Sequence, residues 1–373
     1  MSIFKPFYIL YLVLIVVPIS FQLKTLIDSY VFLVTITVFC VFLLLSKMKI
    51  SKINISELKI EQDHASDKLL YISLFIPLLS SFIYLYLVGF DISILTGDFV
   101  MSDKHDLRLK AISVPYYSIF FKNMITILMP ISIILLIRQR YIFYSISLVV
   151  IFLFFSASNE KYPFLLYFFI ALWVIQSTGR LNFKYYMLFA TLITVILAYM
   201  IKVTMNQSFG FDALGLTVSA LFDRISVISE LVIFSYHEFE NGNYLDGATL
   251  PELFGVIPLN VSSTDSINIS HYLMMLKTGG AGGANASFIT EGFINFGYGF
   301  DLLFVAIAAI WSIFILRLAK LFLSDSNVNT YNMTYMFLLC DLINTNMWVT
   351  IHGSGFILAY LFAFERLAKI GWR

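Results

Sequence analysis

Long, nearly uncharged apolar runs follow one another through almost the whole chain of 373 residues. They lie at 7–21, 29–46, 69–89, 115–137, 141–157, 164–176, 185–203, 288–316, 331–350 and 355–366. A helix needs about 20 residues to cross the hydrocarbon layer of a bilayer, and each run is close to that length. Helix tilt or local thinning of the bilayer accommodates the shorter runs. Hydrophobic residues make up 60% of the chain and charged residues 13%, more apolar surface than a soluble core can bury. The runs predict an all-α integral membrane protein with about ten transmembrane helices.

The remaining totals exclude several classes of function. The net charge of +1 offers no basic field for nucleic acid. Cys40 and Cys340 both lie in apolar runs, no Cys and His residues are spaced as zinc ligands, and neither a P-loop nor a dinucleotide-binding fingerprint is present. We therefore expect no metal and no cofactor. No small-residue cleavage site follows the first run, so we expect that run to be a retained span rather than a signal peptide.

Lys and Arg residues in the linkers indicate the orientation. With the N-terminus in the cytoplasm and the spans alternating, most of the 24 Lys and Arg residues fall in cytoplasmic segments, so we expect both termini in the cytoplasm. The chain is then a single polytopic membrane domain, 1–373, with a large extracytoplasmic loop at 203–287. Apolar spacing at 214–237 predicts an amphipathic helix in this loop, at the membrane interface or over a cavity. The loop residues His237 and Glu240 are interpreted as solvated charges.

A glycine- and asparagine-rich stretch leads into the run at 288–316. Segment 282–300 reads Gly-Gly-Ala-Asn-Ala-Ser-Phe-Ile-Thr-Glu-Gly-Phe-Ile-Asn-Phe-Gly-Tyr-Gly-Phe. It resembles the Wzy-type repeat-unit polymerases of O-antigen and capsule, in which a Gly/Asn/Ser-rich stretch precedes a Glu that opens a helix, then Asn-Phe-Gly and another Gly. The matching positions are Asn285, Ser287, Glu291, Asn295, Phe296, Gly297 and Gly299. The number of spans and the large external loop agree with this family over the rest of the chain.

The resemblance implies a GT-C-like polytopic bundle that acts as a glycosyltransferase in the bacterial cytoplasmic (inner) membrane. Such enzymes join undecaprenyl-diphosphate-linked oligosaccharide repeat units into O-antigen or capsular polysaccharide at the outer face of that membrane, as a step of polysaccharide and lipopolysaccharide biosynthesis. They use no nucleotide sugar and no metal. The implied partners are the lipid-linked substrate, the bilayer, a chain-length regulator and a flippase.

Two other classes of protein stay open. An O-antigen ligase uses the same donor chemistry with a lipid A-core acceptor. A flippase or other transporter moves the lipid-linked unit without breaking a bond, and many such proteins carry repeated halves. We find no inverted repeat in this chain, which favours an enzyme.

A diphosphate leaving group requires cations aimed at the charge that grows in the transition state. Arg224 projects from a largely apolar face of the helix predicted at 214–237, which favours a phosphate partner. A snorkelling side chain, or a local pair with Asp223, explains its position equally well. Lys161 lies at the external start of the run at 164–176, where the helix dipole does not favour a cation, although Glu160 could simply neutralise it. We predict Arg224 and Lys161 as the pyrophosphate-binding residues.

The acceptor hydroxyl requires a base within hydrogen-bond reach, and two residues are candidates. Glu291 begins the run at 288–316. His352 lies in a brief external turn expected at 348–355, between the last two runs. Each has a simpler interpretation, because the helix dipole favours an acid at an N-terminus and interface histidines occur without a role.

Three further residues are weaker candidates for binding the glycan: Asn285 and Asn295 of the motif, and Asp341. An ionisable group inside a span is costly and usually lines a cavity. Asp341, like Asp301, therefore predicts either a polar cavity between helices or a buried hydrogen-bond network.

Overall fold

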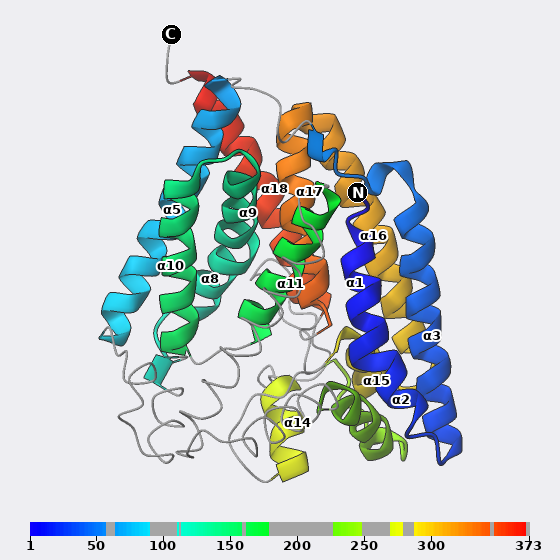
Figure 1. The fold of residues 1–373 in the computed structure, drawn as a ribbon. Coiled ribbons are helices and arrows are strands. Elements are labelled where there is room, and N and C mark those ends of the chain that lie inside the picture. The colour runs from blue at the N-terminus through cyan, green and yellow to red at the C-terminus, as the bar shows by residue number, and fades with distance from the viewer. Residues whose placement is uncertain are drawn as a thin grey trace, which may run out of the picture.

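The computed structural model is a bundle of long helices with a smaller group of helices at one end (Figure 1). The structure describes residues 1–56, 64–89, 110–111, 113–158, 162–178, 227–247, 269–278, 287–343 and 347–370. These residues are almost entirely helical, and the isolated bridge between Ser2 and Lys52 is the β-pairing recorded among them.

The described helices follow the order of the apolar runs, with three short helices at the end of the bundle. They are α1 (Phe4–Tyr11), η1 (Leu12–Val16), α2 (Val17–Ser20), α3 (Leu26–Lys47), η2 (Lys49–Ser51), α5 (His64–Val88), α8 (Tyr117–Asn123), η3 (Met124–Leu128), α9 (Met129–Ile137), α10 (Tyr141–Ser158), α11 (Tyr162–Ser177), the helix at 227–239, α14 (Ile269–Thr278), α15 (Phe288–Phe296), α16 (Phe300–Phe322), α17 (Asp325–Asp341) and α18 (Met347–Ile370).

Five of these helical stretches are long and apolar enough to cross a membrane. They are Leu26–Lys47, Lys68–Val88, Ile119–Ile137, Tyr141–Ser158 and Phe300–Phe322, and Phe4–Ser20 and Pro163–Ser177 are shorter apolar helices. Large apolar side chains on their outer faces are exposed, among them Leu44, Phe75 and Ile310. An exposed apolar girdle of this kind is unfavourable in water and favourable in lipid. The prediction of an all-α protein with membrane-spanning helices is thus confirmed, and the predicted span at 185–203 lies outside the described residues.

Two boundaries predicted from hydropathy are wrong. The run at 288–316 is not one helix, because Gly297 and Gly299 adopt φ angles of 85° and 87° and separate α15 from α16. The turn expected at 348–355 is helical, since α18 begins at Met347. His352 therefore lies inside a helix rather than in an external turn.

Two prolines explain widened turns within the bundle. The π-helical segments η1 and η3 end just before Pro18 and Pro130, which occupy the first turns of α2 and α9. Proline has no N–H and its ring crowds the carbonyl of the preceding turn, and a π-bulge accommodates it without ending the helix. Each proline-containing stretch therefore continues as one long helix.

The most buried helix of the bundle is α17. It contacts α1, α9, α11, α16 and α18, and its residues from Asn327 onward are buried almost without interruption. Its polar side chains Asn327, Asn329, Asn332 and Thr334 are among them. In the view of Figure 1, α1, α3 and α16 lie on one side of it, and α5, α9 and α10 lie on the other.

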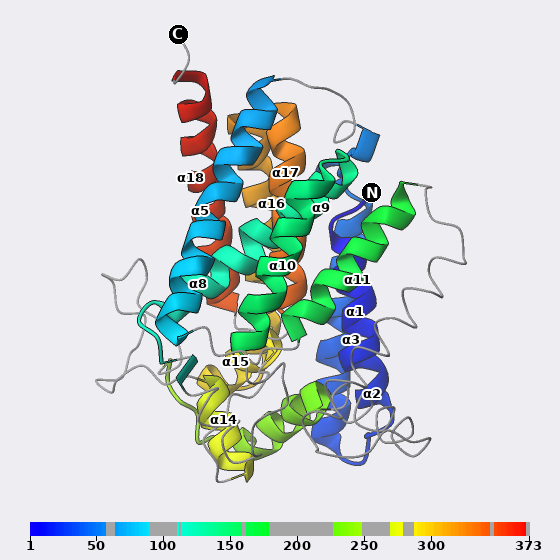
Figure 2. The same ribbon diagram turned by 60° about the vertical axis from the view of Figure 1, so that its left-hand side comes forward.

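The start of α1 and the end of α18 lie at one end of the bundle, and the short helices lie at the other (Figure 1). The helix at 227–239, α14 and α15 form this second group, which we call the distal cap (Figure 2). The helix at 227–239 buries Ile228, Val232 and Tyr236 and leaves Glu238 exposed. Residues 214–226 of the helix predicted at 214–237 lie outside the described residues.

Candidate functional site

The glycines of the motif build a tight break between α15 and α16. A Cβ on Gly292 would collide with the main-chain carbonyl of Phe300, and one on Gly297 would lie 2.6 Å from the ring of Tyr244. Gly297 combines φ 85° with ψ −160°, a region that essentially only glycine occupies. The glycines thus allow close packing at the base of α16, against the backbone of Phe300 and the ring of Tyr244.

Glu291 is fully buried one turn into α15. Its Oε2 accepts a hydrogen bond of 2.9 Å from the backbone N–H of Met347, the first residue of α18. The carboxylate therefore acts as an N-terminal cap for a helix far away in the sequence. Its Oε1 has no hydrogen-bond partner among the described residues.

Burial sets the protonation of this side chain. Glu291 lies on a nine-residue helix that is not one of the membrane-spanning stretches. Desolvation raises the pKa of Glu291 to about 8, and the Met347 hydrogen bond opposes that rise only in part. The carboxyl group is thus mostly neutral at pH 7, and it contacts a backbone amide rather than solvent.

Hydrogen bonds at Asn295 stabilise the end of α15. Its side-chain amide donates to the carbonyl of Glu291 at 2.7 Å, and the residue is fully buried. The backbone N–H groups of Leu245 and Asp246 donate to the carbonyls of Ile294 and Asn295 at 3.0 and 3.1 Å. The segment after the helix at 227–239 therefore satisfies carbonyls that the end of α15 leaves without helical partners.

Asp301 lies at the centre of a buried hydrogen-bond network, one of the two alternatives predicted for it. Tyr30 of α3 donates to its Oδ1 at 2.9 Å and Tyr236 donates to its Oδ2 at 2.8 Å. The hydroxyl of Tyr30 in turn accepts a hydrogen bond from the N–H of Gly299 at 3.0 Å. The network joins α3, the helix at 227–239 and the start of α16.

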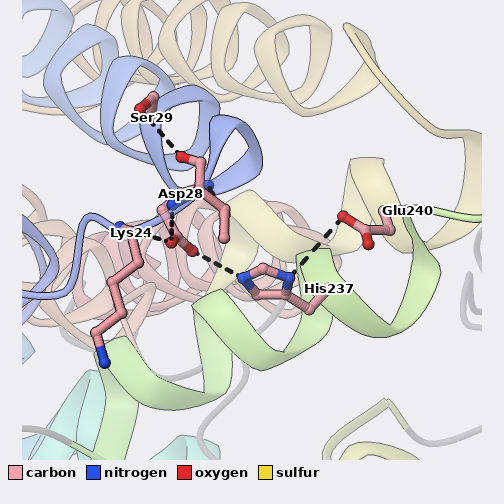
Figure 3. A network of polar contacts seen from close by, with 6 residues as sticks. Lys24, Asp28, Ser29, His237 and Glu240 are labelled. Atoms are coloured by element: carbon pink, nitrogen blue, oxygen red, sulfur yellow. Dashed lines mark hydrogen bonds and ion pairs between the residues drawn. The ribbon is translucent and has the colours of Figure 1, made fainter.

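A second polar network attaches the same helix to α3 (Figure 3). Nε2 of His237 lies 2.8 Å from Oδ1 of Asp28, and its Nδ1 lies 3.9 Å from Glu240. The other oxygen of Asp28 accepts hydrogen bonds from the N–H groups of Lys24 and Thr25 at 2.9 and 2.8 Å, which completes the capping box of α3. The interpretation of His237 as a solvated charge is therefore wrong: the side chain is a half-buried link between two elements.

Aromatic rings pack around the tyrosines of the Asp301 network. Tyr236 stacks on Phe293 at 4.1 Å between ring centroids, and Tyr298 packs edge-on against Phe293 and Tyr30 at 5.0 and 5.1 Å. Tyr298 remains 52% exposed. An exposed aromatic ring can stack against a sugar.

Lys122 is a cation that the sequence analysis left out. It is half-buried in α8, and the negative charge of Asp341, at the end of α17, acts on it. The signal in the sequence is a single Lys within the apolar run at 115–137. Asp341 is itself buried.

The predicted site residues thus fall into two groups. Glu291, Asn295 and Asp341 are described, and the first two lie one helical turn apart on α15. Arg224, Lys161 and Asn285 lie outside the described residues, and for His352 the structure describes the backbone of α18 but not the side chain. Among the described residues, no group of three His, Cys, Asp or Glu side chains could hold a metal ion.

Comparisons with known proteins bring no further assignment. No protein-family model, curated protein or solved structure matches the chain.

Proposed function

We propose that the protein is a membrane glycosyltransferase that polymerises undecaprenyl-diphosphate-linked oligosaccharide repeat units into O-antigen or capsular polysaccharide. The observation that carries this proposal is the arrangement of the motif. Glu291, Asn295 and the glycines form a buried polar helix break where the distal cap joins the apolar bundle. A lipid-linked glycan needs such a boundary, because its polyprenyl chain stays in lipid while its sugars stay in water.

The proposed reaction exchanges one bond at the anomeric carbon of the growing glycan. The bond to the lipid diphosphate breaks, a bond to the acceptor hydroxyl oxygen forms, and the acceptor proton passes to a base. Undecaprenyl diphosphate then leaves, and cations must stabilise the charge that it carries. We assign this task to Arg224 and Lys161 and add Lys122, a half-buried cation of α8.

The geometry favours different roles for the two candidate bases. Glu291 is fully buried and its carboxyl group accepts a hydrogen bond from the first residue of α18, so we assign it a positioning role. His352 lies on the first turns of the helix that Glu291 positions, and we assign it the role of base. Asn285, Asn295 and the exposed ring of Tyr298 are the proposed contacts of the glycan.

In this proposal the distal cap faces the outside of a bacterial cytoplasmic membrane and both termini are in the cytoplasm. A chain-length regulator and a flippase are the proposed protein partners. The supporting feature is that the start of α1 and the end of α18 lie at the end of the bundle opposite the distal cap (Figure 1). This arrangement lets a substrate delivered to the outer leaflet reach the cap.

Glycan length in cells tests the assignment of the cations. Arg224→Ala and Lys122→Ala should each leave a membrane-inserted protein and shift the surface glycan to single repeats. Lys24→Ala is the matched control, because this exposed Lys lies at the same end of the bundle and its ammonium points away from the Asp28 network (Figure 3). Glycan of unchanged length in both variants would refute the proposed diphosphate site.

A further inference from the structure

Two tyrosines contact the same buried ring beside the glycine break of the motif. The rings of Tyr244 and Tyr298 stand edge-on to Phe293, at 5.9 and 5.0 Å between ring centroids. Phe293 is fully buried, whereas Tyr298 is 52% exposed and Tyr244 is half-buried. The N–H of Leu245 donates to the carbonyl of Ile294 at 3.0 Å, which holds the segment that carries Tyr244 against α15. Both rings are therefore positioned before any ligand binds, and this lowers the entropic cost of binding.

Glu240 and His237 present two hydrogen-bond acceptors side by side (Figure 3). Oδ2 of Asp28 accepts hydrogen bonds from two backbone N–H groups, which favours an ionised carboxylate, so its Oδ1 accepts from Nε2 of His237 at 2.8 Å. In the neutral imidazole the lone pair is then on Nδ1, 3.9 Å from Oε2 of Glu240. The two side chains are 37% and 39% exposed, and a ligand with two donors can bind both acceptors.

The surface that carries these groups is acidic. Residues 237–247 contain Glu238, Glu240 and Asp246 and no Lys or Arg, and residues 287–300 add no Lys or Arg. Desolvation raises the pKa of Tyr298, and the phenol of Tyr244 and the carboxylate of Glu240 raise it further. The exposed ring of Tyr298 therefore lies within the electrostatic reach of a carboxylate.

A tyrosine at a helix end can also serve as an anchor in the membrane interface. The segment beside Tyr298 does not suit lipid, because it exposes the side chains of Glu240, Asn241 and Asn243. Lipid tails offer no hydrogen-bond donors to carboxylate and amide groups, whereas sugar hydroxyls do. The combination of an exposed ring with these groups favours a ligand in water.

We propose that Tyr298, Glu240 and His237 form a subsite for one sugar of the glycan, and that this subsite selects a neutral or amino sugar over an acidic one. This assignment rests on the glycosyl transfer proposed above. The ring of Tyr298 stacks on the sugar, and the two acceptors take hydrogen bonds from adjacent hydroxyl groups or from an ammonium group. A uronic acid presents a carboxylate, which the charge of Glu240 repels.

Binding of defined oligosaccharides to the purified full chain tests the subsite. The protein in lipid nanodiscs is applied to an array of oligosaccharides that contain neutral hexoses, hexosamines with a free amino group, or hexuronic acids. We expect retention on neutral or amino-sugar members and none above background on hexuronic acids. Tyr298→Ala should weaken the binding about tenfold, because the stacking contact is lost, and Tyr298→Phe should bind within about twofold of the wild type, because the ring is kept.

Glu240→Gln tests the selection by charge. It keeps the shape of the side chain and removes its charge, so the ratio of neutral to hexuronic acid binding should fall about tenfold. Glu238→Gln is the matched control, because it removes the same charge from the neighbouring exposed acid and should leave the ratio within about twofold of the wild type. An unchanged ratio in Glu240→Gln, or an equal change in both variants, would overturn the selection.

Failure of the subsite is distinguishable from failure of the proposed function. The subsite is overturned if no neutral or amino-sugar oligosaccharide is retained, or if Tyr298→Ala and Glu240→Gln bind as the wild type does, even where the protein polymerises lipid-linked repeats. If both variants lose binding as expected while the wild type builds no polymer, the subsite stands and the glycosyl transfer is refuted.

Discussion

At the scale of single residues, two substitutions of Glu291 distinguish a structural role from a chemical role. Glu291→Gln keeps an oxygen that can accept from Met347 and removes the ability to take a proton, whereas Glu291→Ala removes the acceptor and leaves a cavity. We expect Glu291→Ala to cost about 2–4 kcal/mol of stability and to abolish polymer formation. The free energy of unfolding of Glu291→Gln should lie within about 1 kcal/mol of the wild-type value, and this variant should still make polymer. Thermal unfolding and glycan length in the same cells provide the two readouts.

The two substitutions distinguish a positioning residue from a base. If Glu291 takes the proton from the acceptor, Glu291→Gln is as inactive as Glu291→Ala while remaining folded. If it holds α18, the Gln variant is active and its pH–rate profile matches that of the wild type. A folded but inactive Gln variant therefore contradicts the positioning role.

The raised pKa of Glu291 makes stability depend on pH. An unfolded Glu has a pKa of ~4.3, and burial raises the folded pKa to about 8, so the folded state binds the proton more tightly. The stabilisation is fully present below the unfolded pKa and is lost as the pH rises through about 8. The thermal midpoint of the wild type should fall between about pH 5 and pH 9 more steeply than that of Glu291→Gln. Equal slopes for the two proteins would show that the carboxyl is already ionised in the fold.

Gly297 offers a second residue-scale comparison. Gly297→Ala forces a Cβ against the ring of Tyr244 in a backbone conformation reserved for glycine, so we expect a loss of about 2–4 kcal/mol. Gly242→Ala is the control, because Gly242 has a φ of 86° but nothing within 4 Å of the added Cβ, and it should cost only about 1 kcal/mol. Chemical unfolding of both variants measures the difference, and similar losses would rule out the steric role assigned to Tyr244.

At the scale of elements, the helix at 227–239 is attached by residues that hydropathy does not identify. His237→Ala removes the link to Asp28 while leaving the capping box of α3 intact. Because the imidazole is partly exposed, we expect a local loss of roughly 1 kcal/mol, or about fivefold faster hydrogen exchange at 227–239. Glu238→Ala, at the exposed neighbouring position, should leave the exchange unchanged. Equal exchange in both variants would contradict the attachment by His237.

The elements also show where prediction from the sequence stops. Length and apolarity are local properties, so the spans at 29–46 and 141–157 were found within a few residues of α3 and α10. The start of α18 was missed because its cap comes from Glu291, which is 56 residues away in the chain. The link between His237 and Asp28 spans 209 residues and has no local pattern at all. The break at Gly297 was visible as glycine spacing, but the continuous apolar composition of 288–316 outweighed it.

At the scale of the whole molecule, polarity is concentrated at the two ends of the bundle. The distal cap carries the buried networks around Asp301 and Asp28, and the opposite end carries a cavity lined by Lys5 and Trp173. Between them, the outer faces of the long helices expose apolar side chains. In the proposed function, the lipid-linked substrate is processed at the membrane face of the distal cap.

The most direct measurement of the proposed activity is polymerisation by the purified protein. The full chain in lipid nanodiscs is mixed with a synthetic undecaprenyl-diphosphate-linked repeat unit, without nucleotide sugar or any other protein, and the products are separated by size. A ladder of glycans that grows by whole repeats, together with release of undecaprenyl diphosphate, is the expected result. Single repeats that remain on their lipid carrier, with an intact and folded protein, would contradict a polymerase and favour a ligase or a transporter.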